Sequence, residues 1–95
     1  MSYIRISLMK PAQGREEEVK RLNQEISALN LTQEECRYSS VISATDGSGE
    51  LGRLSVWESK EAAEGVANLQ RSMSLRSQLH LAIQPEHAER SFFTL

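Results

Sequence analysis

Hydrophobic and polar residues alternate along the first stretch of the chain. Ile4, Ile6 and Leu8 lie on one side of an extended backbone, and polar or aromatic residues occupy the positions between them. This period of two predicts a β-strand over residues 3–9. Pro11 ends the strand because proline lacks the N–H donor that a strand ladder requires.

The period then lengthens to that of an amphipathic helix. Glutamates at 16–18 precede the apolar stripe and suit the electropositive start of a helix. The stripe consists of Val19, Leu22, Ile26 and Leu29. We predict a helix from about 14 to 29, with Asn30 as a left-handed stop.

A β-hairpin is predicted next. Residues 37–45 are rich in small and β-branched side chains and show no helical stripe, which is typical of a strand. The sequence Asp-Gly-Ser-Gly at 46–49 supplies a turn, and residues 50–58 form the returning strand. On the returning strand Leu54 and Val56 share one face, and Leu51, Arg53, Ser55 and Trp57 share the other.

The rest of the chain predicts helical segments and a closing strand. Ser59 is placed to cap a helix. The apolar positions of this helix are Ala62, Val66, Leu69 and Met73. Ser72 and Ser74 indicate a kink, after which Leu75, Leu79 and Ile83 predict a short third helix that ends near Pro85. Residues 89–95 form the closing strand, which leaves His87 in a loop.

The order β-α-β-β-α-(α)-β predicts an α+β fold, a ferredoxin-like βαββαβ sandwich with a four-stranded antiparallel sheet. A length of 95 residues corresponds to one domain, spanning residues 1–95. We expect the helices to cover the side of the sheet that carries Ile4, Ile6, Leu8, Leu54 and Val56. The other face would stay bare in a monomer, so we expect a homodimer in which two sheets pair.

The face expected to stay bare mixes aromatic rings, hydroxyls and two guanidinium groups. This mixture suits a partly wet cavity between two sheets, in which a few polar groups orient a small molecule. The candidate substrate-binding residues are Arg5, Ser7, Tyr38, Arg53, Ser55 and Trp57. The pattern does not decide which face of its strand Tyr38 occupies, or which arginine points inward.

Composition narrows the classes of function. The chain is 39% hydrophobic and 25% charged, as in globular domains, and its net charge of −2 argues against a nucleic-acid partner. The single cysteine, Cys36, cannot form an internal disulfide, which favours a reducing, cytoplasmic location. No apolar run is long enough to span a membrane, and the N-terminus lacks the pattern of a signal peptide.

The residues with intrinsic reactivity are isolated in the sequence. His80 and His87 do not have the spacing of a metal site, and we expect both at the surface. Cys36 has no neighbouring basic group that would activate its thiol. No nucleophile–base pair and no glycine-rich phosphate loop emerge, so we expect no metal and assign no catalytic residue.

Three sequence segments resemble the antibiotic biosynthesis monooxygenase family of dimeric α/β barrels. They are Lys10-Pro11 before the acidic helix, Cys36-Arg37-Tyr38, and the junction Val56-Trp57-Glu58-Ser59-Lys60-Glu61-Ala62. The resemblance implies a ferredoxin-like protomer whose sheet pairs with a second copy to enclose a barrel. The family includes oxygenases that act on polycyclic phenols and quinols without a cofactor, and also haem-degrading enzymes.

The chain departs from the family at several functional positions. Many members have an acid two residues before the junction tryptophan, where this chain has Ser55. Many also have a histidine on the following helix, where Val66 and Ala67 stand here. The asparagine of the haem degraders falls at or near Arg5, and Trp57 is the single tryptophan, which argues against that subgroup.

Two hypotheses for function follow. In the first, a cofactor-independent monooxygenase-like protein acts on a phenolic or quinol-type molecule, with Arg5 or Arg53 stabilising anionic oxygen and Trp57 and Tyr38 holding the ring. In the second, the same cavity belongs to a non-catalytic binding or regulatory barrel. A weaker third possibility is a component that acts only with a partner. Trp57 as plain packing, and the arginines as ion pairs at a dimer interface or barrel rim, are the simpler alternatives.

Overall fold

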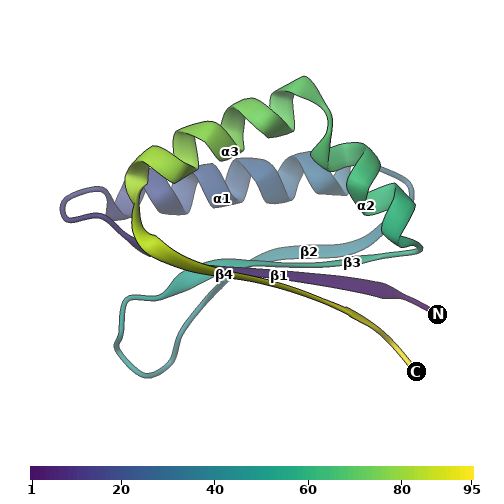
Figure 1. The fold of residues 1–95 in the computed structure, drawn as a ribbon, viewed down its shortest axis with the longest axis horizontal. Helices are drawn as coiled ribbons and strands as arrows, with labels where there is room; N and C mark the ends of the chain where they lie inside the picture. Colours follow the sequence, from purple (N-terminus) through teal and green to yellow (C-terminus); the bar gives the residue numbers. More distant parts are fainter.

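Four strands form one antiparallel sheet, and three helices lie together on one side of it (Figure 1). The computed structural model describes residues 1–95. The elements are β1 (Tyr3–Pro11), α1 (Glu16–Leu31), β2 (Cys36–Ser43), β3 (Leu51–Trp57), α2 (Lys60–Ala67), α3 (Gln70–Ala82) and β4 (Ile83–Phe93). The strand order β2-β3-β1-β4 is that of the ferredoxin-like fold, which confirms the predicted architecture.

Local sequence signals account for the turn and the cap of this fold. In the β2–β3 turn, Gly47 and Gly49 adopt φ values of 78° and 82°, which glycine reaches without strain. The Ser48 amide donates to the Asp46 carboxylate at 2.9 Å, closing the turn. Ser59 caps α2, because its Oγ accepts a hydrogen bond from the Ala62 amide at 3.1 Å.

The helix boundaries differ from the prediction at two places. The break between the second and third helices lies at 68–69, before the serines expected to cause it, and α3 is 13 residues long. Its inner side carries Ser72, Leu75, Leu79 and Ala82, so Met73, expected in the core, is 49% exposed. Asn30 does not stop α1 but lies buried within it. Both errors arise because apolar spacing alone does not show where one helical stripe gives way to another.

The last strand begins earlier than predicted. β4 starts at Ile83, directly after α3, and contains Pro85 and His87. A proline is tolerated here because β4 is an edge strand, with a partner on one side only. His87 therefore lies on a strand and not in a loop.

The helices cover the opposite face of the sheet from the one predicted. Tyr3 and Met9 on β1 are 5% and 4% exposed, and Trp57 on β3 is 1% exposed, whereas Ile4 and Ile6 are only partly buried. Alternation shows which residues share a face but not which face the helices cover. The usual preference for the more aliphatic side fails here because large apolar residues also stand at both ends of the face that carries the arginines.

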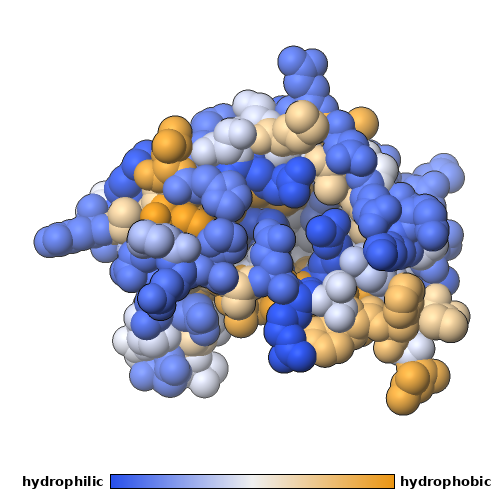
Figure 2. Space-filling model, viewed as in Figure 1, coloured by the Kyte–Doolittle hydropathy of each residue, from blue (hydrophilic) through white to orange (hydrophobic).

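The other face of the sheet, which we call the open face, has no covering layer in the protomer. Strand register places on it Ile4, Ile6, Leu8, Tyr38, Ser40, Ile42, Leu54, Val56, Ala88, Arg90 and Phe92. These side chains are partly or fully exposed. Apolar residues are visible along the lower, sheet side of the molecule in Figure 2. The open face is therefore the largely aliphatic surface of the protomer.

Two separate apolar clusters hold the helices on the sheet. One consists of Met9, Val19, Leu22, Ile26, Leu75, Leu79 and Ala82, and the other of Tyr3, Trp57, Ala63 and Val66. The two clusters do not merge, so the helix-covered face is apolar at its ends and different in its middle.

None of the three helices has the length and apolar character that crossing a bilayer requires.

Candidate functional site

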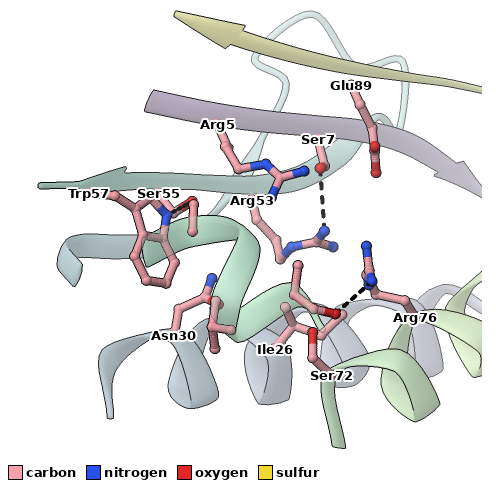
Figure 3. Close-up of a pocket in the computed structure, with 13 residues that line it drawn as sticks. Arg5, Ser7, Ile26, Asn30, Arg53, Ser55, Trp57, Ser72, Arg76 and Glu89 are labelled. Atoms are coloured by element: carbon pink, nitrogen blue, oxygen red, sulfur yellow. Dashed lines mark hydrogen bonds between the residues drawn. The ribbon is translucent and has the colours of Figure 1, made fainter. Parts of the chain in front are cut away.

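A cavity separates the two apolar clusters, between the sheet and the helices. β1 contributes Arg5 and Ser7 to its wall, and β3 contributes Arg53, Ser55 and Trp57. The helices add Ile26 and Asn30 from α1, Ala63, Val66 and Ala67 from α2, and Ser72 and Arg76 from α3, while Glu89 comes from β4 (Figure 3). The enclosed volume is about 40 Å³, which is room for a few water molecules or one small polar group.

Five of the six residues predicted to bind substrate meet at this cavity. They are Arg5, Ser7, Arg53, Ser55 and Trp57. The cavity lies inside one protomer and not between two sheets, because the helices cover the face on which these residues stand. This location corrects the expectation of a chamber enclosed by paired sheets.

Tyr38 is the candidate that the structure places elsewhere. Tyr38 pairs with Val56 and Ser40 pairs with Leu54, and both β3 partners stand on the open face. Tyr38 consequently stands on the open face, where it is 53% exposed. It cannot hold a ring in the cavity of its own protomer.

Trp57 forms one end wall of the cavity and packs at the same time. Its indole Nε1 donates to the Ser55 hydroxyl at 2.8 Å, which satisfies its one polar group. The ring lies in the cluster with Tyr3, Ala63 and Val66. The packing role and the wall role expected for this residue therefore coexist.

Arg53 crosses the cavity from the sheet to α1. Its Nη1 donates to Asn23 Oδ1 at 2.7 Å, and its Nη2 donates to the Ser7 hydroxyl at 3.3 Å. The Asn23 amide is oriented for this bond because its Nδ2 donates to the Val19 carbonyl at 2.9 Å. Both hydrogen-bond partners of Arg53 are neutral. They fix the position of the guanidinium but do not neutralise its positive charge.

Burial lowers the pKa of Arg53 from its ordinary value to about 10. The nearby positive charges of Arg76 and Arg5 lower it further, and the negative charge of Glu89 opposes the shift. At neutral pH Arg53 is still protonated. The shift shows that positive charge is crowded in a partly dry space.

Arg76 reaches into the cavity from α3. Its Nη2 donates to the Ala67 carbonyl at 2.8 Å, which ties α3 to the end of α2. Its Nε is the one buried side-chain nitrogen or oxygen in the structure that lacks a hydrogen-bond partner. A buried donor without an acceptor is unfavourable and calls for an explanation.

The cavity carries more positive than negative charge. Three guanidinium groups line it, from Arg5, Arg53 and Arg76, against one carboxylate, that of Glu89. All ion pairs of the protein lie elsewhere, on the outer surfaces of the helices. Figure 3 shows Glu89 directed from β4 toward the arginines, without a bond to them. This arrangement attracts anions.

A second hollow adjoins the cavity over β1 and β4. Its floor includes Tyr3, Ser91 and three residues shared with the cavity, namely Arg5, Ser7 and Glu89. Its volume is about 200 Å³, larger than that of the enclosed part. Every residue of β4 after Ile83 is exposed, so the hollow opens to solvent. The site thus has a small charged interior and a wider mouth.

Sequence reasoning missed part of the polar lining. The missed residues are Asn30, Ser72, Arg76 and Glu89, together with Asn23 behind the lining, which accepts a hydrogen bond from Arg53. A signal was present for Asn23 and Asn30, since they follow Val19 and Ile26 by four positions and so lie on the inner side of α1. Arg76 and Glu89 had none, because they enter the cavity only through the packing of α3 and β4 against β1 and β3.

The remaining reactive residues lie outside the cavity. The rings of His80 and His87 are exposed and stand 5.1 Å apart between centroids. Burial raises the pKa of the Cys36 thiol, which keeps it protonated and unreactive at neutral pH. No three His, Cys, Asp or Glu side chains gather as a metal site would need.

Comparison with known proteins establishes the fold. No model of a known protein family and no curated protein matches the chain. Rv0793 from Mycobacterium tuberculosis superposes with a TM-score of 0.90 at 17% identity, over 100% of this chain and 96% of that chain.

Two further structures carry names that bear on function. SnoaB, a cofactor-independent oxygenase from Streptomyces nogalater, superposes with a TM-score of 0.84 at 11% identity, over 99% of this chain and 93% of that chain. A proposed antibiotic biosynthesis monooxygenase from Nitrosomonas europaea superposes with a TM-score of 0.89 at 8% identity, over 99% of this chain and 90% of that chain. The chain therefore has the fold of the antibiotic biosynthesis monooxygenases, as its resemblance to that family implied.

Proposed function

We propose that this chain is a member of the antibiotic biosynthesis monooxygenase family that oxidises a phenolic or quinol-type small molecule without a cofactor. The observation that carries the proposal is the cavity lined by three arginines with no ion-paired acid and closed at one end by Trp57. The shared fold and the Trp57-Glu58-Ser59 junction support it.

The two hollows divide the substrate between them. The enclosed part, about 40 Å³, is too small for an aromatic ring. The ring therefore occupies the wider hollow over β1 and β4, and an oxygen of the substrate reaches inward to Arg5 and Arg53. The residues that fix its orientation then come from three strands and three helices.

The chemistry asks the protein to stabilise negative charge on oxygen. Deprotonation of the substrate gives an anion whose electron pair adds to dioxygen at a ring carbon that bears hydrogen. The resulting hydroperoxide loses water and leaves a carbonyl. One oxygen atom enters the product, and the other leaves as water with the hydrogen of that carbon and the proton first taken from the hydroxyl. Arg53 and Arg5 stabilise both the first anion and the peroxide.

Glu89 is the proton acceptor that the cavity offers. It is the one carboxylate in the lining, and it faces the arginines from β4 (Figure 3). A carboxylate beside the substrate hydroxyl takes the proton, and the neighbouring positive charges favour the anion that remains. Ser55, which stands where many relatives have an acid, donates or accepts hydrogen bonds but does not act as a base at neutral pH.

Oxygen uptake with a panel of anthrones and quinols tests this function. The expected result is uptake above background, with a product that has gained one oxygen atom and lost two hydrogens. With labelled dioxygen, one labelled atom is expected in the product and one in water. Arg53→Gln should reduce turnover about 100-fold or more, while Arg71→Gln, on the outer side of α3, should leave it unchanged. Absence of uptake across the panel would contradict the proposal.

A second candidate is a binding protein that does not turn its ligand over. Ser55, Val66 and Ala67 stand where acid and histidine side chains are common in the family, which favours this alternative. A ligand that quenches Trp57 fluorescence and raises the melting temperature, yet yields no product, would support it over catalysis.

We also propose that the protein is a homodimer in the cytoplasm, formed by pairing the open faces of two sheets. The aliphatic open face supports this, because a monomer would leave a continuous apolar surface in water. Each protomer keeps its own cavity in such a dimer. Sedimentation of the purified protein at micromolar concentration tests it, and a stable monomer would contradict it.

A further inference from the structure

Arg76, which lines the cavity, has a buried Nε without a hydrogen-bond partner. A guanidinium has five N–H donors and no acceptor, and Arg76 commits one of them to the Ala67 carbonyl. Its Nε–H is buried and has no acceptor within the protein.

Arg53 and Arg5 aim further free donors at the same space. Arg53 uses two of its N–H groups, on Asn23 and Ser7, and Arg5 makes no side-chain hydrogen bond within the protein. All three guanidiniums border the enclosed volume, and Arg76 and Arg5 are close enough to depress the pKa of Arg53. Several planar donor groups thus converge on one small volume.

We infer that this arginine cluster is a carboxylate subsite, and that the ligand of the cavity is an aromatic carboxylic acid bound with its carboxylate between Arg53 and Arg76. The inference rests on the proposed function in taking the cavity as the ligand site, but it holds whether or not the ligand is oxidised. It names a substrate class narrower than phenols in general.

Geometry and charge favour a carboxylate over other oxygen anions. A carboxylate has two oxygens that accept up to four hydrogen bonds, and it matches the planar fork of a guanidinium. It is ionised at neutral pH without the help of a base, whereas a phenol is not. The enclosed volume of about 40 Å³ suits such a group, and the adjoining hollow over β1 and β4, with Tyr3 in its lining, leaves room for an attached ring.

Benzoate and its neutral isostere benzamide provide the test on the unmodified protein. Binding of each is measured by Trp57 fluorescence and by calorimetry at low salt. We expect benzoate to bind about tenfold more tightly or more, because only the ion forms charge-assisted hydrogen bonds. Its affinity should fall with added sodium chloride, while that of benzamide stays constant. Equal affinities, or no saturable benzoate binding at millimolar concentrations, would overturn the inference.

Two arginines on α3 give a matched pair of variants. Arg76→Gln should weaken benzoate binding about tenfold and leave benzamide binding unchanged. Arg71→Gln removes an equal charge on the outer surface, where Arg71 contacts Glu25, and should change neither affinity. If Arg76→Gln does not fold, the comparison of benzoate with benzamide on the unmodified protein still tests the carboxylate subsite. If it folds and binds benzoate like the original protein, the inference is wrong.

Inorganic phosphate and oxygen uptake separate the neighbouring explanations. Phosphate that displaces benzoate as well as acetate does would show a general oxyanion site and overturn the carboxylate assignment. Benzoate has no oxidisable group, so its binding is independent of turnover. Benzoate binding without uptake of oxygen in the quinol panel refutes the catalytic proposal alone. Uptake without benzoate binding refutes this inference alone.

Discussion

The two faces of the sheet carry different kinds of surface, although the same strands build both. The open face is largely aliphatic, with Ile4, Ile6, Leu54 and Val56 at its centre. The helix-covered face is apolar only at its two ends and carries arginines in its middle. A uniform surface suits a flat partner such as another sheet, whereas a surface with a polar gap suits a ligand. The division indicates that assembly and ligand binding use opposite sides of the sheet.

The strongest way to break this comparison is to place a charge on the open face. Leu54→Glu puts an unpaired carboxylate at the centre of the proposed dimer interface, where desolvation is costly. We expect the dissociation constant of the dimer to rise about 100-fold or more, as measured by sedimentation. Met73→Glu, on an exposed part of α3, is the matched control and should leave the dimer intact. A dimer that survives Leu54→Glu would show that the open face is not the interface.

Side-chain truncations on the two sides of the sheet should lower the free energy of unfolding by different amounts. Leu22 is fully buried under the helices, so Leu22→Ala should lower the free energy of unfolding by about 2–5 kcal/mol. Val56 is partly buried on the open face, and Val56→Ala should lower it by about 1 kcal/mol. Chemical denaturation measures both values. Equal losses would show that the helix layer packs less closely than described.

In the middle of the helix-covered face, stability should depend on hydrogen-bond partners more than on side-chain volume. Asn23→Leu removes the acceptor of Arg53 Nη1 and should lower the free energy of unfolding by about 1–3 kcal/mol. Adding Arg53→Met should recover part of this loss, since the unpaired cation is gone. A double-mutant cycle measures the coupling. Strictly additive losses would mean that the Asn23–Arg53 bond contributes nothing.

The pKa of Arg53 gives a pH dependence with opposite signs for binding and stability. Burial lowers the pKa of Arg53 to about 10 in the folded chain, well below that of an ordinary arginine. Benzoate affinity should therefore fall as the pH rises through about 10. Between the lowered pKa of Arg53 and the ordinary pKa of arginine, the unfolded chain binds one more proton than the folded chain. The contribution of Arg53 to the free energy of unfolding therefore rises with pH in this range. The fall in affinity should be absent in Arg53→Gln, and a fall that persists there belongs to another group.

The smallest effect concerns the helix that closes the cavity. Ser59→Ala removes the Oγ acceptor at the start of α2 and should lower the free energy of unfolding by about 1 kcal/mol. Because α2 carries Ala63 and Val66 over the cavity, ligand affinity should weaken slightly as well. Thermal denaturation with and without benzoate measures both. An unchanged melting temperature would show that the cap is not needed.

Periodicity was sufficient for the architecture, because it depends on the order of elements and on strand alternation. The pattern of Ile4, Ile6 and Leu8 against Arg5 and Ser7 grouped the right residues together. It could not decide which group faces the helices, because large apolar residues such as Trp57 and Met9 lie on the polar side. The prediction of which residues share a face was right, and the prediction of which face the helices cover was wrong.

Residues of the site were predictable only where a strand supplies them. Arg5, Ser7, Arg53 and Ser55 share a face by simple alternation. The face of Tyr38 stayed undecided because alternation groups it with Ser40 and Ile42, and this group is no more apolar than its neighbours on the strand. Arg76 was missed because the side of α3 that faces the cavity is set by where α3 begins, and the break was predicted several residues too late.

A crystal structure of the protein with benzoate tests the central claim most directly. That claim places the ligand site between the sheet and the helices of a single protomer. The predicted result is a benzoate whose carboxylate lies between Arg53 and Arg76, with its ring toward β1 and β4. A benzoate bound instead on the open face, beside Tyr38 and between two paired sheets, would contradict it.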